Sequence, residues 1–535
     1  MKSQRLTFYL MREEVSDFAA ALDASKEYRT VSLAEDSGLD GEFHYLPSRP
    51  SMPAWASFVE PVLQDKLDGV LTSSAAAVLL LRIRGRIFAL TFSFGRSLLD
   101  LAKIENQFGL RVALNRIDAR QIRSLDTKTY EDMVVSTNTQ ASKSAELPTF
   151  GVDVSTDILR AVTGEPRDPT FATRISGADS LIMGVKTHAP DLPSICSDLL
   201  DAYRETTYKR DFEWIDQLTT VKDSTQIDNL NTQLVAQLQA GDTGATHLAM
   251  PDPLIWNEID GFKITGTGDH EYTDLDLSDY LEQLGTNRNK LSLAALKNRH
   301  VQVRFNRSGN FDKQWTLYRC IVTEQRLDGN LHVLIEGRWF AVSETLVEKV
   351  DHFTEGLHDA RLPLPPAQPG EVEPDYNTRL ADQSPNRLLK LDARIHRPGG
   401  ASSGIEFCDV FSDEGELIHV KRESRSATLS HLFAQGTVSA LTFINDDEYR
   451  TELRGLINQT VPQDSSDKWL NLIPPAGNTV ERSKYRVTYA VITDSKREGR
   501  NWLPFFSKLN LMQHAKQLVS SGFEVAVARV PIADR

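Results

Sequence analysis

Cysteine is scarce in this sequence, and its few copies are widely spaced. Among 535 residues, the only cysteines are Cys196, Cys320 and Cys408. An odd number of distant cysteines indicates neither a disulfide framework nor a zinc cluster. We therefore expect a protein of the reducing cytoplasm.

A long uninterrupted hydrophobic run is also missing. The most apolar stretch, residues 75–94, contains Arg82, Arg84 and Arg86. These charges exclude a membrane-spanning helix there, because each is costly to place in the hydrocarbon layer. The opening residues, MKSQRLTFYL, are typical of a β-strand and lack the apolar segment and cleavage site of a secretion signal. We expect no membrane partner.

Motifs for phosphate loops and covalent catalysis are absent too. Residues 266–269 (GTGD) lack the strand, glycine loop and Lys-Ser/Thr context of a P-loop. No Ser-His-Asp or Cys-His set can be proposed from spacing alone. A nucleotide-modifying toxin therefore has no supporting motif.

Positive charge is scarce overall but not everywhere. The net charge is −14, which argues against a protein that coats nucleic acid with its whole surface. Residues 371–535 carry 21 Lys/Arg and 22 Asp/Glu, so the first 370 residues carry a net −13. A local basic face is therefore expected only in the last third.

The length and composition indicate a multidomain globular protein. A chain of 535 residues exceeds one ordinary core, and 40% hydrophobic with 25% charged residues is typical of globular proteins. The clearest boundary is the segment 361–373 (RLPLPPAQPGEVE), whose prolines exclude a packed element. We expect a mixed α/β domain at 1–180, a helical segment followed by a β-meander at 181–357, a linker with a short helix at 358–386, and an α/β domain at 387–535.

Hydrophobic periodicity predicts the individual elements. In the first domain we expect a strand at 6–10, helices at 13–22, 95–108 and 154–162, a hairpin at 78–92, a strand at 110–114 and an exposed loop at 127–148. In the second we expect helices at 191–204, 212–219 and 343–353, with strands at 300–305, 315–324, 332–336 and 338–342. We also expect a hairpin turn at Asp328-Gly329 and Ser343 as the N-cap of the helix that follows. In the last third we expect α-β-β-β-α-α-β-α-β, namely 376–382, 388–395, 404–411, 416–422, 428–441, 448–458, 485–493, 509–520 and 523–530.

The hairpin at 404–422 (GIEFCDVFSDEGELIHVKR) carries the best candidate chemistry. Strand alternation places Leu417, His419 and Lys421 on one face. Asp409 lies on the paired strand, near its end. A carboxylate beside a lysine suits metal-assisted phosphodiester cleavage, in which the metal is Mg²⁺ or Mn²⁺ and the lysine supports the nucleophile or the developing charge.

Together with the element order, this hairpin resembles the PD-(D/E)XK restriction-endonuclease-like superfamily. The resemblance covers about 150 residues and implies an α-β-β-β-α-β sheet with flanking helices. Asp409 matches the first acid of the motif and Lys421 its lysine. Gln435 resembles the glutamine of the exonuclease-like branch. The fold class expected for the whole chain is α/β and α+β multidomain.

The second acidic position of that motif is His419, and this departure leaves several alternatives open. Imidazole suits softer metals than Mg²⁺. Either another acid substitutes, with Glu406, Glu416 and Glu373 as candidates, or the site has lost cleavage and kept binding. A hairpin whose charges only pair across strands is the third alternative.

The following helix and nearby arginines supply candidate nucleic-acid contacts. Gln435 and His431 lie one helical turn apart. Gly436, in mid-helix, costs about 1 kcal/mol relative to alanine, which favours a close backbone approach there. Guanidinium groups bind phosphate bidentately, although a solvated face is the common alternative. The candidate arginines are Arg422, Arg425, Arg450 and Arg454.

Several phrases also resemble one family along nearly the whole chain: GRIFALTFSFGR, FGLRVALN, FGVDVSTDILRAVTG, IHVKR with LSHLFAQGTVSA, and LPFFSKLNL. They are similar to a sporadically distributed, poorly characterised bacterial family that travels with mobile elements and defence islands. The resemblance implies anti-phage or anti-plasmid defence. One hypothesis is a metal-dependent nuclease acting on DNA, with Asp409 and Glu406 as metal ligands. The other is a non-catalytic sensor of nucleic acid or a phage component. A second copy or another defence protein is the expected protein partner.

Overall fold

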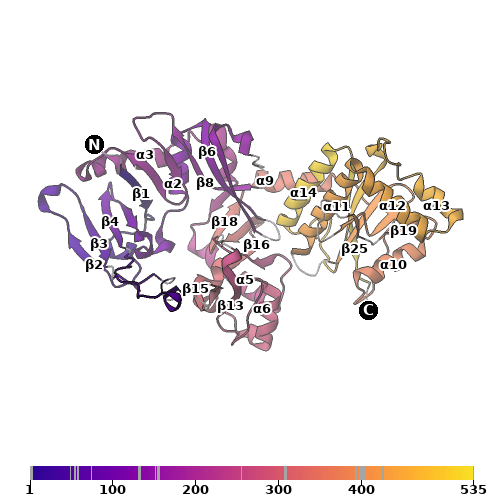
Figure 1. The fold of residues 1–535 in the computed structure, drawn as a ribbon, viewed down its shortest axis with the longest axis horizontal. Coiled ribbons are helices and arrows are strands. Elements are labelled where there is room, and N and C mark those ends of the chain that lie inside the picture. Colours follow the sequence, from indigo (N-terminus) through magenta and orange to yellow (C-terminus); the bar gives the residue numbers. More distant parts are fainter. Residues whose placement is uncertain are drawn as a thin grey trace. The chain divides into compact units, whose positions relative to one another are not determined.

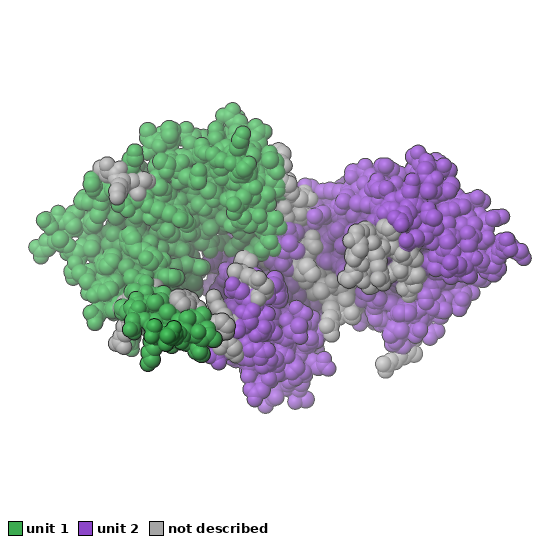
Figure 2. Space-filling model, viewed as in Figure 1, with its two compact units in different colours: residues 1–128, 136–215 green, residues 129–135, 216–535 purple. Residues whose placement is uncertain are grey.

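The computed structural model describes residues 4–47, 50–53, 56, 59–73, 75–130, 134–150, 152, 157–252, 254, 256–306, 310–391, 394–396, 404–422 and 427–533. The fold is mixed α/β, with several antiparallel sheets (Figure 1). The chain forms two compact units, residues 1–128 with 136–215, and residues 129–135 with 216–535 (Figure 2). In the described part of the chain, no helix is both long and apolar enough to cross a membrane.

The first unit is built on one large sheet with the strand order β2-β3-β4-β5-β1-β10-β9-β8-β6-β7. The predicted hairpin is β4 (Ala76–Ile83) and β5 (Arg86–Ser93), which turn at Arg84 and Gly85 with positive φ at both positions. Helices α2 (Phe108–Arg116) and α3 (Leu192–Arg204) pack in the core of this unit. The remaining strands are β1 (Gln4–Leu10), β2 (Arg29–Ser32), β3 (Gly41–Leu46), β6 (Ile117–Tyr130), β7 (Val134–Ala145), β8 (Asp157–Pro166), β9 (Ile175–Gly177) and β10 (Leu181–Val185).

Several predictions for this unit are wrong. The predicted helix 95–108 is replaced by two short 3₁₀ turns at 95–98 and 101–103, and the predicted strand 110–114 lies inside helix α2. Gly109 lies within that helix, and glycine is required there because a Cβ would lie 1.9 Å from the carbonyl oxygen of Ser180. The predicted loop 127–148 is largely strands β6 and β7, and the polar composition of β7 reflects its exposure. The predicted helix 154–162 is instead largely strand β8, although residues 154–156 lie outside the described part, and 13–22 contains only a 3₁₀ turn.

Residues 216–357 of the second unit contain two antiparallel sheets around one core. The first sheet has the order β11-β18-β17-β16-β12, and its β16–β17 hairpin turns at Asp328-Gly329, as predicted. Its strands are β11 (Leu218–Thr220), β12 (Thr246–Leu248), β16 (Ile321–Leu327), β17 (Asn330–Ile335) and β18 (Arg338–Val342), and the second sheet has β13 (Ile259–Ile264), β14 (His300–Phe305) and β15 (Phe311–Thr316). The helices include α5 (Ser224–Ala240), α6 (Leu277–Leu284), α7 (Leu293–Asn298) and α9 (Glu344–Glu355). The Ser343 hydroxyl caps α9 by accepting a hydrogen bond from the Leu346 N–H, as predicted.

The last part of the chain forms a five-stranded mixed sheet with the order β19-β22-β23-β24-β25. Strand β22 is antiparallel to both of its neighbours, whereas β23, β24 and β25 are parallel. The strands are β19 (Leu388–Lys390), β22 (Val410–Ser412), β23 (Glu416–Arg422), β24 (Arg486–Thr493) and β25 (Glu524–Pro531), with a separate small pair, β20 (Arg394–His396) and β21 (Ile405–Glu406). The helices are α10 (Glu373–Gln383), α11 (Ala427–Asn445), α12 (Asp447–Thr460), α13 (Gln463–Leu470) and α14 (Phe505–Ser520).

Strand alternation divides this sheet between two cores. Leu417, Val487 and Val491 face a core shared with α11 and α14. Ile418 and Val420 face a second core, to which α10 contributes Tyr376 and Leu380. The sheet is therefore covered on both faces, which explains why its late strands are continuously apolar. The predicted element order is confirmed, with α13 and the β20–β21 pair in addition.

Candidate functional site

Two carboxylates lie where β22 stops pairing with β23. The last paired residue of β22 is Val410, opposite Ile418. Beyond it, Asp409 Oδ2 accepts the N–H of Val420 at 2.8 Å, and Glu373 Oε1 accepts the N–H of Arg422 at 3.0 Å. Two residues of strand span about 6.6 Å. The two acids therefore replace the missing strand along one edge of β23, on either side of Lys421.

Lys421 completes this group. Its Nζ lies 2.8 Å from Oε2 of Glu373, and the side chains of Lys421 and Glu373 are 28% and 27% exposed. Glu373 is the first residue of α10, so that helix brings the acid to the carboxyl end of β23. The partner of the lysine is therefore Glu373, one of the three substitute acids that the sequence left open, and solvent reaches the pair.

Asp409 is held from a second side by α10. Asn377 lies one helical turn after Glu373, and its Nδ2 donates to Asp409 Oδ1 at 3.0 Å. Each oxygen of the Asp409 carboxylate thus has a neutral donor. The Asn377 side chain belongs to the buried interior, with 1% of the residue exposed. No sequence signal marked this asparagine.

Glu406 and Gln435 form a separate contact. Gln435 Nε2, on α11, donates to Oε2 of Glu406 at 2.8 Å. The pKa of the fully buried Cys408 thiol is raised well above its ordinary value, first by burial and then by the charges of Asp409 and Glu406. Both predicted metal ligands therefore lie within electrostatic range of Cys408. Glu416, another of the substitute acids, is fully buried and binds Thr488 and the N–H of Arg361, away from Lys421.

His419 lies in the hydrophobic core. Its exposed fraction is 0%, and neither ring nitrogen has a hydrogen-bond partner among the described residues. Its ring neighbours Tyr489 at 6.3 Å between centroids, and burial lowers the pKa of the imidazole to about 4. In this position a neutral His419 does not join Lys421 and the two acids.

The structure describes four of the five predicted nucleic-acid-binding residues. Arg450 is 3% exposed, donates to the Phe443 carbonyl and pairs with Asp447. Arg454 donates to the carbonyls of Leu470 and Ile473. These two guanidinium groups stabilise the helical layer, which corrects the expectation that they face a ligand.

The other predicted contacts are nearer to solvent. Arg422 is half-buried at the end of β23, and His431 is exposed on α11. Arg425 lies outside the described residues. In the described ranges, no three His, Cys, Asp or Glu side chains gather closely enough to hold a metal by themselves.

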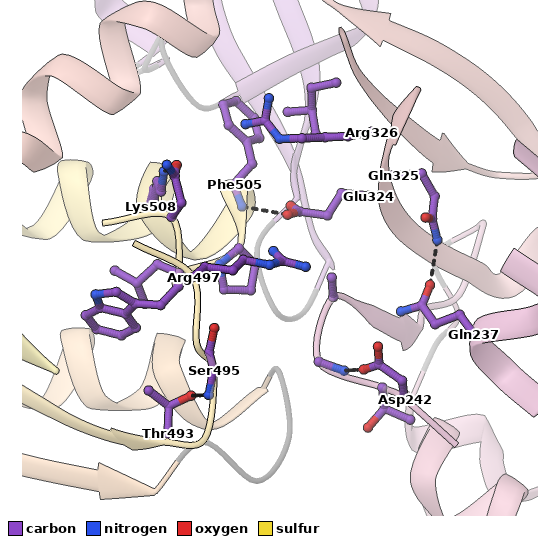
Figure 3. Close-up of a pocket in the computed structure, with 18 of the residues that line it drawn as sticks. Gln237, Asp242, Glu324, Gln325, Arg326, Thr493, Ser495, Arg497, Phe505 and Lys508 are labelled. Carbon is purple, nitrogen blue, oxygen red and sulfur yellow. Dashed lines mark hydrogen bonds between the residues drawn. The ribbon is translucent and has the colours of Figure 1, made fainter. Parts of the chain in front are cut away.

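The second unit also contains a polar cleft of about 1130 Å³, which no sequence motif predicted (Figure 3). Glu324 of β16 accepts the N–H groups of Phe505 and Phe506, at 2.8 and 3.2 Å, in the first turn of α14. Burial raises the pKa of Glu324, and these two N–H donors oppose that shift. Lys508 is bound by Asp351 at 2.7 Å and by Asn501 at 3.0 Å. The central charges of this cleft are thus engaged with protein groups.

Comparison with known proteins gives one result. No curated protein and no solved structure matches the chain. One family model matches residues 6–531, nearly the full length. The chain therefore belongs to the DUF6119 family, a family of unknown function.

Proposed function

We propose that this protein is a metal-dependent DNA nuclease of bacterial defence against phages and mobile elements, and that residues 358–533 form its restriction-endonuclease-like domain. The observation that carries the proposal is the pair of carboxylates bound to the N–H groups of Val420 and Arg422, on either side of Lys421. The sheet order β19-β22-β23-β24-β25, with only β22 reversed, supports it. The family resemblance supports the role in defence.

In this proposal Glu373 is the second acid of the motif. His419 stands at the position of that acid in the sequence but lies in the core. Glu373 reaches Lys421 from α10 instead, and its carboxylate is 2.8 Å from the ammonium group. An acid supplied by a neighbouring helix restores the charge that the histidine lacks.

The donor set fits Mg²⁺ or Mn²⁺. Both ions prefer carboxylate oxygens, and Mg²⁺ is usually held by one or two carboxylates together with water and substrate phosphate. Glu373 and Asp409 would hold it, because hydrogen bonds to α10 and β23 fix both carboxylates beside Lys421. The ion would stabilise negative charge at the phosphate and lower the pKa of a bound water.

The residues of the chain provide the remaining functions. Glu373 holds the Lys421 ammonium at the end of β23, where it is 28% exposed. From there Lys421 stabilises the charge that develops on the phosphate or orients the attacking water. Arg422, the next residue and also half-buried, contacts a flanking phosphate.

Cleavage of supercoiled plasmid by the full-length protein tests this proposal. We expect nicking that requires Mg²⁺ or Mn²⁺ and is lost in Lys421→Ala. The matched control is Lys484→Ala, which removes an exposed lysine paired with Glu481 in the same domain. We expect this control to cleave normally, and melting temperatures verify that both variants fold. Absence of products from plasmid, linear DNA and RNA with either ion would refute the nuclease.

A second function, a non-catalytic nucleic-acid sensor, is favoured by one observation. His419, at the position of the second acid of the motif, is buried in the core. Such a sensor would bind DNA in a salt-dependent way. Binding that persists in Asp409→Ala, without any cleavage by the wild type, would select this function.

A further inference from the structure

Asn377 is a buried amide whose side chain, among the described residues, hydrogen-bonds only to Asp409 of the proposed site. Its Nδ2 donates to Asp409, while its Oδ1 is buried and has no partner among the described residues. A buried acceptor without a partner lowers stability, because it has lost its hydrogen bonds to water and gained none in the protein. Asn377 therefore makes the folded protein less stable than an apolar side chain of the same size would.

The neighbours of Asn377 show what the fold alone would favour there. On the same helix, Tyr376 and Leu380 pack in the apolar core against β22 and β23. A leucine at 377 has the same branched shape and carries no polar atom of its own that would need a partner. Buried polar groups that lower stability are found mainly where a site requires them.

The proposed site explains why an asparagine stands at position 377. The N–H of Val420 fixes one oxygen of Asp409, and the Asn377 amide fixes the other. Two donors on different elements, β23 and α10, set both the position and the plane of the carboxylate. Glu373 and Asn377 lie one turn apart on α10, so this helix places one acid directly and orients the other.

We propose that Asn377 is a positioning residue that orients Asp409 for a divalent cation, at the expense of stability. This inference rests on the proposed function, because it assigns Asp409 to the cation. Groups that orient a metal ligand typically change metal affinity by about 10- to 100-fold when they are removed. Asn377 thus acts through Asp409 and does not contact the substrate.

The test measures Mn²⁺ binding and thermal stability of the full-length protein. We expect Asn377→Leu to weaken Mn²⁺ binding by about tenfold or more while the melting temperature stays the same or rises. Asn377→Ser, which is too short to reach Asp409, should weaken binding to the same extent if the leucine variant folds poorly. The matched control is Asn510→Leu, since Asn510 is a buried asparagine of α14 whose Nδ2 donates to the hydroxyl of Ser430.

The outcomes separate this inference from the proposed function. Wild-type Mn²⁺ affinity in Asn377→Leu and Asn377→Ser would overturn the positioning role while leaving the nuclease intact. A lower melting temperature with unchanged affinity would assign Asn377 to the fold alone, which also overturns it. Absence of Mn²⁺ binding and of cleavage in the wild type would refute the proposed function itself.

Discussion

Gly436 in the middle of α11 gives the sharpest test of how the helical layer meets the sheet. A Cβ at this position would lie 2.6 Å from Cε1 of Tyr489 and 3.0 Å from its hydroxyl oxygen. Tyr489 is fully buried on β24, and its hydroxyl donates to the Phe433 carbonyl at 3.0 Å. The ring is therefore fixed to the same helix that the new methyl group would push away.

The expected effect of Gly436→Ala is the balance of two terms. Replacing glycine by alanine inside a helix stabilises it by about 1 kcal/mol. Forcing one extra methyl group into a filled core costs about 1–3 kcal/mol. We expect a cost in the upper half of this range, because the Tyr489 ring cannot move without breaking its hydrogen bond to Phe433. We expect a net loss of about 1–2 kcal/mol.

Gly455→Ala on α12 is the matched control. A Cβ at Gly455 meets no atom within 4 Å, so only the helical gain of about 1 kcal/mol remains. Urea unfolding followed by tryptophan fluorescence measures both variants, since Trp469 and Trp502 lie in the core that contains Tyr489. If Gly436→Ala stabilised the protein as much as Gly455→Ala does, the predicted clash with Tyr489 would be refuted.

Two further predictions concern buried titratable groups. Glu324→Ala removes the acceptor of two N–H groups in the first turn of α14, and should lower the free energy of unfolding in urea by about 1–2 kcal/mol. Unchanged stability would show that Glu324 does not stabilise the start of α14. Burial lowers the pKa of His419 from the ordinary 6.5 to about 4 in the folded protein, so the unfolded chain binds a proton more readily. The free energy of unfolding therefore carries the full contribution of the neutral His419 above pH 6.5 and loses it as the pH falls toward 4. His419→Leu should remove about 3 kcal/mol of that pH dependence, without lowering stability at pH 7. Equal slopes of stability against pH in both proteins would show that His419 titrates normally.

Local features of the fold could be predicted from the sequence. The turns at Arg84-Gly85 and Asp328-Gly329, the cap at Ser343 and the order of elements after residue 373 depend on neighbouring residues or on simple periodicity. Gly436 is a similar case, because a glycine in mid-helix indicated a close approach and Tyr489 supplies it. The same reasoning failed in the first unit, where the short apolar segment 108–116 suits a strand and a buried helix equally well.

The candidate site could be predicted only in part. Asp409 and Lys421 were found because they belong to one hairpin, but Glu373 was one of three substitute acids, and its contact with Lys421 joins residues 48 positions apart. Asn377 gave no signal, because a single buried asparagine on a helix has no motif. Alternation correctly put His419 and Lys421 on one face of β23 but could not show that the core ends between them. The pairing of Glu324 with α14 spans 181 residues and was equally inaccessible.

The central claim is that Glu373, and not His419, supplies the second acid beside Lys421. Plasmid nicking by Glu373→Gln and His419→Leu, at equal protein and Mn²⁺ concentrations and with melting temperatures recorded, tests it most directly. We expect Glu373→Gln to lose cleavage, because the carboxylate that binds Lys421 has lost its charge, whereas His419→Leu should cleave like the wild type. Full cleavage by Glu373→Gln, or its loss in a folded His419→Leu protein, would contradict it.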